Sequence, residues 1–180
     1  MKKSHARKIV LKKRNLFNIK NRKINFKNLL KLINHKSVNK KIGLYFPIGS
    51  EVCTIDLIEN LRKKKYIISL PVIDKNFEMS FYEWAKNNPL NINKFGIPEP
   101  LRSKKIIPST LIIPLLAFDI NLNRLGYGGG FYDRFISKLE KSKKILKIGL
   151  ALSCQKINKV PTDKFDKKMN YIFTESKIYK

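Results

Sequence analysis

Apolar residues in the first part of the chain recur every three or four positions, the spacing that places them on one face of a helix. One series consists of Ala6, Ile9, Val10 and Phe17, and a second, after a mostly polar break at residues 21–25, consists of Phe26, Leu29, Leu30 and Ile33. The pattern predicts two amphipathic helices near the N-terminus.

A strand, a helix and a second strand are predicted next. Residues 42–46 form a short apolar run that Pro47 ends, as expected of a buried strand. Residues 54–64 carry apolar side chains at helical spacing, and residues 66–70 are again a short apolar run. The order strand, helix, strand is that of a βαβ unit, whose two strands lie parallel in one sheet.

The second half of the chain continues this alternation. Further strands are expected at residues 79–84, 111–116, 145–152 and 171–173, and a helix is expected after a glycine-rich segment, with Tyr132, Phe135, Ile136 and Leu139 on its apolar face. Residues 87–100 are interrupted by Pro and Gly, which predicts an irregular loop. Pro114 has no N–H for a sheet ladder, so it must lie near the end of its strand or at a bulge.

Strands that alternate with helices indicate the α/β class. We expect a single three-layer domain over residues 1–180, in which helices flank a mostly parallel central sheet on both faces. The length of 180 residues suits one domain, and a hydrophobic content of 43% is enough to form its core. Ligands of such sheets collect at the carboxyl ends of the strands, where the glycine-rich segment is predicted to lie.

The chain shows no sign of secretion, membrane insertion or cysteine chemistry. Its apolar runs are far shorter than the roughly 18 residues of a membrane-spanning helix, and its basic N-terminus lacks the apolar stretch of a signal peptide. Cys53 and Cys154 lie far apart and form no C-x-x-C pair, which argues against a disulfide framework or a zinc site. We therefore expect a soluble, cytoplasmic protein without a membrane partner, and we expect it to be a monomer.

The net charge of +26 raises the question of nucleic-acid binding. The excess is nearly all lysine, and it is mixed with Asn and Ile throughout the chain, which favours a general compositional bias over a focused binding patch. Adaptation of the site to polyanionic ligands is a second interpretation, and dedicated RNA or DNA binding is the least favoured. We expect salt-dependent, nonspecific attraction to nucleic acid, but no specific nucleic-acid partner.

The segment from Arg124 to Arg134, with the sequence RLGYGGGFYDR, holds four of the eight glycines within five residues. Glycines allow a backbone to turn several N–H groups toward one point, and a following helix adds a partial positive charge. The two arginines can donate paired hydrogen bonds to phosphate oxygens. The segment therefore predicts a phosphate site rather than a simple surface turn, which remains the structural alternative.

Two familiar phosphate loops do not fit this segment. The pattern G-x-G-x-x-G of dinucleotide-binding folds would need glycine where Phe131 stands. A Walker A loop would end in Gly-Lys followed by Ser or Thr, which is missing here.

At these residues the sequence resembles the 5-formyltetrahydrofolate cyclo-ligase family, also called 5,10-methenyltetrahydrofolate synthetases. The family's glycine run follows an aromatic-Asp pair, which is Phe118-Asp119 here. The likeness spans nearly the whole chain and includes Lys3-x-x-x-Arg7, Tyr45-Phe46-Pro47, Glu51-Val52, Leu70-Pro71-Val72, residues 79–84, residues 96–100, Gln155, Pro161, Asp166 and Thr174-Glu175. The order and spacing of these segments together make the resemblance specific.

The resemblance implies an ATP-dependent ligase that converts 5-formyltetrahydrofolate to 5,10-methenyltetrahydrofolate and releases ADP and phosphate. A formamide oxygen is a poor leaving group, and its phosphorylation would activate the formyl carbon for attack by N10. Such chemistry depends mainly on positioning and charge neutralisation. ATP is then a co-substrate, and Mg²⁺ is the expected cofactor.

The resemblance also implies nucleotide and metal residues. Lys3 and Arg7, one helical turn apart, match the family's N-terminal nucleotide contacts. The ATP-binding segment comprises Arg124, Leu125, Gly126, Tyr127, Gly128, Gly129, Gly130, Phe131 and Tyr132, within which Arg124 and Tyr132 are expected to be catalytic. Asp133 and Asp166 match the metal ligands, since carboxylates suit Mg²⁺. The alternatives are a helix-capping acid for Asp133 and a surface acid for Asp166.

For the folate substrate, the resemblance implies Phe46 and Glu51, with residues 127–131 (Tyr127, Gly128, Gly129, Gly130 and Phe131) covering the reacting end. A carboxylate such as that of Glu51 can accept hydrogen bonds from the amino and ring N–H groups of a pterin. Trp84 and Met79 are candidate pocket walls, because flat rings favour aromatic and thioether surfaces, although both could equally be core residues.

One position departs from the family pattern. Three residues after Asp119 the family usually has glycine, and this chain has Leu122. We therefore expect the turn from Asp119 to Arg124 to differ in shape. Two other functions stay open at this point: a basic module that binds RNA or other polyanions, and a different phosphotransfer enzyme with the same kind of loop. The first would need exposed aromatic residues among basic ones, whereas the aromatic residues here fall mostly at core spacing.

Overall fold

The computed structural model describes residues 2–17, 24–37 and 39–180. Its α-helices are α1 (Lys3–Leu16), α2 (Lys27–Lys36), α3 (Ile55–Lys63) and α4 (Phe131–Glu140), and a 3₁₀-helix, η2, spans Ser153–Gln155. The strands are β1 (Lys41–Gly43), β2 (Ile67–Ile73), β3 (Met79–Glu83), β4 (Leu90–Ile92), β5 (Pro98–Pro100), β6 (Lys105–Ile106), β7 (Thr110–Pro114), β8 (Ala117–Phe118), β9 (Arg124–Leu125), β10 (Leu146–Leu150), β11 (Tyr171–Phe173) and β12 (Ile178–Tyr179).

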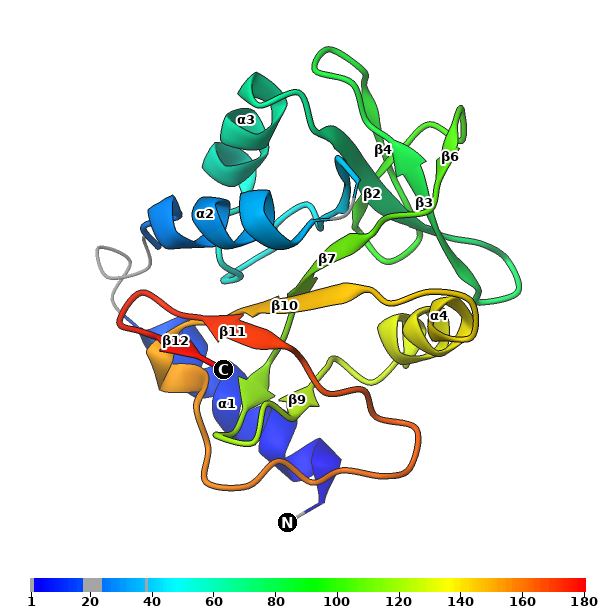
Figure 1. The fold of residues 1–180 in the computed structure, drawn as a ribbon. Coiled ribbons are helices and arrows are strands. Elements are labelled where there is room, and N and C mark those ends of the chain that lie inside the picture. Colours follow the sequence, from blue (N-terminus) through cyan, green and yellow to red (C-terminus); the bar gives the residue numbers. More distant parts are fainter. Residues whose placement is uncertain (1, 18–23, 38) are drawn as a thin grey trace.

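The main sheet has eight strands in the order β12-β11-β10-β7-β1-β2-β3-β6 (Figure 1). Its five middle strands, from β11 to β2, pair in parallel, and the strands at both ends pair antiparallel. Helix α3 connects the parallel neighbours β1 and β2, so the expected βαβ unit is confirmed. The sheet is therefore mixed but mostly parallel, as the alternation of strands and helices predicts.

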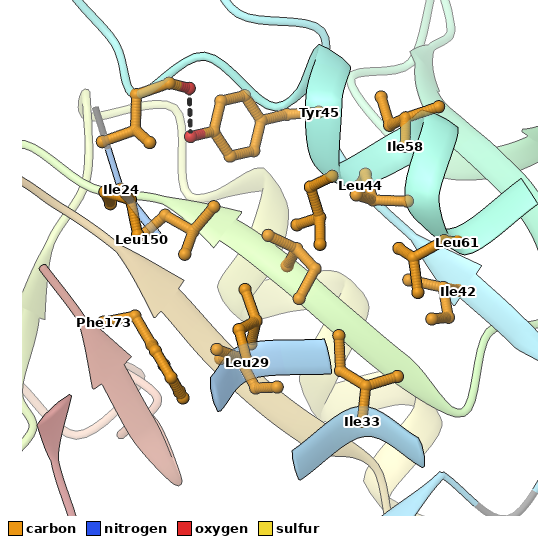
Figure 2. Close-up of a cluster of buried hydrophobic side chains, with 14 of the residues drawn as sticks. Ile24, Leu29, Ile33, Ile42, Leu44, Tyr45, Ile58, Leu61, Leu150 and Phe173 are labelled. Carbon is orange, nitrogen blue, oxygen red and sulfur yellow. Dashed lines mark hydrogen bonds between the residues drawn. The ribbon is translucent and has the colours of Figure 1, made fainter. Parts of the chain in front are cut away.

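Helices cover both faces of the sheet (Figure 1). In β7, the side chain of Ile112 belongs to the core cluster that includes α2 and α3, whereas Leu111 and Ile113 belong to the cluster that includes α4. This alternation is the period-two pattern of a strand that is buried on both faces. Figure 2 shows the first cluster, in which the buried Tyr45 hydroxyl donates a hydrogen bond of 2.8 Å to the Val52 carbonyl oxygen.

Helix α1 lies outside these two clusters. Its Ala6 and Val10 form a third buried cluster with Ala117 of β8, Leu125 of β9 and Val160. This cluster fixes the N-terminal helix beside the small β8–β9 sheet, which leads directly into the glycine-rich segment. Ile9, which the spacing places among the apolar positions of this helix, is 40% exposed.

The predicted elements are largely confirmed, with two main differences. The strand expected at residues 42–46 ends at Gly43, because the chain turns away into the loop that carries Phe46 and Glu51. The expected irregular loop at residues 87–100 is wrong in part, since β4 and β5 pair there as a hairpin. The expectation for Pro114 is confirmed, since it is the last residue of β7, where its missing N–H costs no sheet hydrogen bond. The polar break predicted at residues 21–25 lies mostly outside the described residues.

Within the described part of the chain, no helix has the length and apolar character needed to cross a membrane.

Candidate active site

A cavity of about 540 Å³ opens at the carboxyl ends of β1 and β7. Its wall is built from α1, the loop after β1, the ends of β2 and β7, the β4–β5 hairpin and the segment 124–133. The sequence-predicted site residues that line it are Lys3, Arg7, Phe46, Glu51, Asp166 and every residue from Arg124 to Asp133. The fold thus brings together residues from both ends of the chain, at the edge of the sheet where the sequence predicts a ligand.

The glycine-rich segment connects β9 to α4 (Figure 1) and takes backbone conformations that favour glycine. Gly128 has φ of 115°, and Gly130, which directly precedes α4, has φ of 64°. A side chain would be strained at both positions. The loop therefore delivers the N-terminus of α4 to the cavity, and a helix N-terminus attracts anions.

Basic residues of α1 reach this loop and the loop that carries Asp163 and Asp166. The Nε atom of Arg7 donates a hydrogen bond of 2.9 Å to the Gly126 carbonyl oxygen. The Nζ atom of Lys3 lies 2.8 Å from Oδ2 of Asp163 and 2.6 Å from Oδ2 of Asp166. Helix α1 therefore connects two loops that are distant in sequence and places its cations in the cavity wall.

Arg124 and Tyr132 carry polar atoms without a partner among the described residues. Arg124 is 6% exposed, and its Nη2 atom lies 2.8 Å from Oδ2 of Asp133. Its Nε atom and the Tyr132 hydroxyl are buried and make no hydrogen bond within the described structure. Burial raises the pKa of Tyr132, and the charge of Glu51 adds to that shift, so this hydroxyl stays protonated and able to donate. Buried donors of this kind usually have a partner, and both residues line the cavity.

Asp133 and Asp166 both face the cavity, but each already contacts cations or N–H groups of the protein. Asp133 pairs with Arg124 and accepts a hydrogen bond of 3.0 Å from the Lys167 N–H. Asp166 accepts hydrogen bonds from Lys3 and from the Asp163 N–H. Neither side chain fits its structural alternative fully: Asp133 does not cap α4, whose N-cap is Gly130, and Asp166 is only partly exposed.

The donor set fits Mg²⁺ in a particular way. Within the described ranges, no group of three or more His, Cys, Asp or Glu residues is arranged to hold a metal. Mg²⁺ commonly binds through one or two carboxylates together with phosphate oxygens and water. Two cavity carboxylates beside the glycine-rich segment therefore suit a metal that binds together with an anionic ligand, rather than a site built by the protein alone.

Glu51, a further carboxylate of the cavity wall, has different hydrogen-bond partners from Asp133 and Asp166. Its Oε1 atom accepts a hydrogen bond of 2.5 Å from the Tyr127 hydroxyl, and its Oε2 atom accepts one of 3.1 Å from the Ile48 N–H. Burial raises the pKa of Glu51, while these two hydrogen bonds and the charge of Arg14 oppose the shift. Both oxygens of the carboxylate thus accept hydrogen bonds from neutral donors. A carboxylate has further acceptor sites, so it could also receive N–H groups of a substrate.

Trp84 does not line the cavity among the described residues, in contrast to the expectation that it forms a pocket wall. It packs edge-on against Phe46 at a ring-centroid distance of 6.0 Å, and its indole N–H donates to the Asn88 carbonyl oxygen. Arg62 stacks over its ring at 4.4 Å. The indole therefore supports Phe46 from behind, because its own faces are used by neighbours. Met79, the other candidate wall, does line the cavity.

The sequence reasoning does not identify several residues that line the cavity or lie next to its wall. Phe95, Ile97 and Glu99 reach the cavity from the β4–β5 hairpin, which the sequence presents as an irregular loop. Arg14 is 3% exposed and donates to the Tyr127 hydroxyl. A signal for Arg14 exists in the sequence, since it follows Ala6 and Val10 at intervals of four residues and so falls on the buried stripe of α1.

The turn that departs from the family pattern keeps a glycine-like conformation. Leu122 has φ of 63°, in the left-handed region that glycine adopts most easily. The buried Asp119 organises the turn, because its Oδ1 atom accepts hydrogen bonds from the Asn121 and Asn123 N–H groups. The chain therefore makes this turn in spite of leucine, and Arg124 is still placed at the cavity.

Three comparisons with known proteins identify the family of this chain. A model of the 5-formyltetrahydrofolate cyclo-ligase family matches residues 1–175. A 5-formyltetrahydrofolate cyclo-ligase of Haemophilus influenzae is 37% identical over 135 residues, which cover 71% of this chain and 71% of that protein. An NMR structure of Aquifex aeolicus 5,10-methenyltetrahydrofolate synthetase is similar with a TM-score of 0.75 and 32% identity, over 99% of this chain and 92% of that one.

A further solved structure supports the fold. A 5,10-methenyltetrahydrofolate synthetase from Mycoplasma pneumoniae superposes with a TM-score of 0.76 at 24% identity, over 97% of this chain and 99% of that chain. Because the family match covers nearly the whole sequence and the Haemophilus relative aligns over more than two thirds of it, the chain belongs to the 5-formyltetrahydrofolate cyclo-ligase family.

Proposed function

We propose that the protein catalyses the ATP-dependent conversion of 5-formyltetrahydrofolate to 5,10-methenyltetrahydrofolate, with release of ADP and phosphate. The observation that carries the proposal is the pair of unpartnered buried donors, Arg124 Nε and the Tyr132 hydroxyl, at the glycine-rich segment of the cavity. They supply hydrogen bonds to oxygens that a bound ligand must bring, as transferring phosphate groups do. Family membership supports the identity of the two substrates.

The nucleotide is assigned to the side of the cavity formed by α1 and the glycine-rich segment. Lys3, Arg7 and the backbone of residues 125–130 would surround its phosphates, and the N-terminus of α4 would add positive potential. When bound, Mg²⁺ would neutralise phosphate charge, and Asp133 and Asp166 are the carboxylates that would hold it. The ion pairs of these acids with Arg124 and Lys3 keep them in place at the cavity wall.

The folate is assigned to the side formed by Phe46, Glu51 and Tyr127. The Phe46 ring offers a flat apolar surface, and Glu51 can accept hydrogen bonds from pterin N–H groups. Residues 127–131 would lie between the two substrates and exclude water from the reacting atoms, which strengthens every charge interaction there.

The proposed reaction proceeds in two steps. The formyl oxygen attacks the γ-phosphorus of ATP, an O–P bond forms, and ADP leaves. N10 then attacks the activated carbon, the C–O bond breaks, phosphate leaves with that oxygen, and N10 gives up its proton to solvent. Arg124 and Tyr132 would act in both steps by donating hydrogen bonds to phosphoryl oxygens as their charge shifts.

The experiment is a direct assay of the reaction. Purified protein is incubated with 5-formyltetrahydrofolate and MgATP, the absorbance of the methenyl product is followed, and ADP is measured in parallel. We expect methenyl product and ADP in equal amounts, with none when ATP is omitted or when EDTA removes Mg²⁺. A folded protein that forms no methenyl product under the complete conditions would exclude the proposed function.

A further inference from the structure

Arg14 is a buried cation that the proposed chemistry does not use. It is 3% exposed on α1 and is absent from the cavity wall. Its Nη1 atom donates a hydrogen bond of 2.7 Å to the Tyr127 hydroxyl, and its Nε atom donates one of 2.9 Å to the Ser50 hydroxyl. Because removing a guanidinium from water is costly, its burial requires good partners, and these partners lie beside the substrate cavity.

Tyr127 links Arg14 to Glu51. Its hydroxyl accepts the hydrogen bond from Arg14 and donates its own proton to Oε1 of Glu51. The Arg14 guanidinium also lies 5.7 Å from the centre of the Tyr127 ring, within the range of a cation–π contact. The tyrosine side chain is therefore held at its tip although the residue is 47% exposed. The chain of contacts joins α1, the glycine-rich segment and the loop after β1.

The charge of Arg14 also acts on Glu51. Burial raises the pKa of Glu51, and the Tyr127 hydrogen bond, the Ile48 N–H and the Arg14 charge oppose that shift. The other titratable groups that interact with Glu51 are Tyr45 and Tyr132, whose own pKa values are raised first by burial and then by its charge. Arg124 lies beyond Tyr132 and acts on that hydroxyl.

We propose that Arg14 is a positioning residue for the folate side of the cavity: it fixes the Tyr127 hydroxyl against Glu51 and so holds the carboxylate in the orientation that receives the substrate. The inference rests on the proposed function and deepens it. Arg14 acts through Tyr127 and touches neither substrate, so its loss changes substrate affinity rather than the chemical step.

Four variants test this role: Arg14→Met, Arg14→Lys, Tyr127→Phe and the double variant Arg14→Met with Tyr127→Phe. Lys13→Met is the matched control, since Lys13 is the exposed neighbour on the same helix. KM for 5-formyltetrahydrofolate, KM for ATP and kcat are measured for each, together with thermal unfolding. Calorimetric titration with 5-formyltetrahydrofolate alone gives an affinity that does not depend on turnover.

We expect Arg14→Met to raise KM for 5-formyltetrahydrofolate about tenfold, the effect of losing one hydrogen bond to a charged group. KM for ATP and kcat should stay within about twofold. Tyr127→Phe should also raise KM for 5-formyltetrahydrofolate, Arg14→Lys should recover part of the affinity, and the double variant should bind folate no more weakly than the weaker-binding single variant, because both changes remove the same contact. As pH falls, KM of Arg14→Met should begin to rise at a higher pH than that of the wild type, since Glu51 then takes up a proton more easily.

Several results would overturn the inference. An unchanged folate KM in Arg14→Met with normal folding, an increase in ATP KM instead, or additive effects in the double variant would each show that Arg14 is only structural. If Arg14→Met fails to fold, Arg14→Lys decides. It keeps the charge but loses the directed hydrogen bonds of the guanidinium to Tyr127 and Ser50, so folate KM should still rise in part, and no rise would overturn the inference. A wild-type protein without turnover would refute the proposed function, and the calorimetric affinities of wild type and the folded Arg14 variant would then decide the inference separately.

Discussion

The guanidinium of Arg124 and the carboxylate of Asp133 lie 2.8 Å apart, with Arg124 the first residue of β9 and Asp133 in the first turn of α4. This ion pair spans the glycine-rich segment and fixes both of its ends. It leaves Arg124 Nε without a partner among the described residues. The same contact thus orders the loop and preserves a donor for a ligand.

Replacing Arg124 by Met should reduce kcat by about two to three orders of magnitude, because one donor to the shifting phosphoryl charge is lost. The apolar stem keeps much of the buried volume. Arg102→Met is the control, since Arg102 is exposed and does not line the cavity. Steady-state kinetics with MgATP and 5-formyltetrahydrofolate check the effect, and a kcat near the wild-type value would remove Arg124 from the catalytic step.

Replacing Asp133 by Asn should damage turnover far more than folate binding. Asparagine has a similar size but lacks the charge that Mg²⁺ prefers, so the loss should be greatest at limiting Mg²⁺. The helix should survive, because Asp133 is not the N-cap of α4. Asp56→Asn, in the first turn of α3, is a matched control for a general effect at a helix start. Normal turnover of Asp133→Asn across a titration of Mg²⁺ would mean that Asp133 is structural.

The sequence predicts most of this site because its signals are local. The four glycines and two arginines within residues 124–134 indicate a phosphate loop before any fold is known, and the alternation of elements places that loop at the carboxyl edge of the sheet. The ion pair of Lys3 with Asp166 joins residues at opposite ends of the chain. Only the resemblance to a family suggests that such distant residues share one site.

Other features depend on packing that no local pattern records. Trp84 has the residue type of a pocket wall, yet its faces contact Phe46 and Arg62. Residues 98–100 contain two prolines and still form β5, because a two-stranded hairpin leaves room for residues that cannot donate. Leu122 adopts a positive φ that its residue type disfavours, since Asp119 and the surrounding core determine the turn.

Replacing Lys3 or Arg7 by Ala should weaken ATP binding while the thermal midpoint changes little, because loss of an exposed or partly exposed charge usually costs less than about 0.5 kcal/mol. Lys8→Ala, on the exposed side of the same helix, serves as the control. ATP affinity is measured by calorimetry and stability by circular dichroism. If both variants bind ATP like the wild type, this part of α1 is ordinary surface.

Replacement of Phe46 and replacement of Trp84 should differ in their effects on folate binding. Phe46 lines the cavity, whereas Trp84 packs behind it. Phe46→Ala should therefore raise KM for 5-formyltetrahydrofolate strongly, and Trp84→Phe should change it less than about threefold, since an aromatic ring still supports Phe46. An equal loss of folate affinity in both variants would place the indole in direct contact with the substrate.

Glu140, the last residue of α4, should contribute to stability in a pH-dependent manner. Its carboxylate pairs with Lys147 of β10 and lies 3.0 Å from the Lys167 ammonium. Burial alone would raise the pKa of Glu140, but the hydrogen bonds from Lys147 and Lys167 outweigh it and lower the pKa. A lowered pKa in the folded state stabilises the protein above the unfolded pKa, and the contribution disappears as pH falls through the folded pKa.

Glu140→Gln should therefore reduce the free energy of unfolding by about 0.5–1 kcal/mol at neutral pH, the range of a largely screened ion pair. The difference from the wild type should vanish as pH falls below the acidic range in which Glu140 titrates. Glu78→Gln is the matched control, because Glu78 is far more exposed and its pair with Lys138 is longer, at 3.8 Å. Urea unfolding across an acidic pH series measures both variants. A Glu140→Gln difference that persists unchanged at the lowest pH would show that packing of the α4 terminus, rather than its charge, provides the stability.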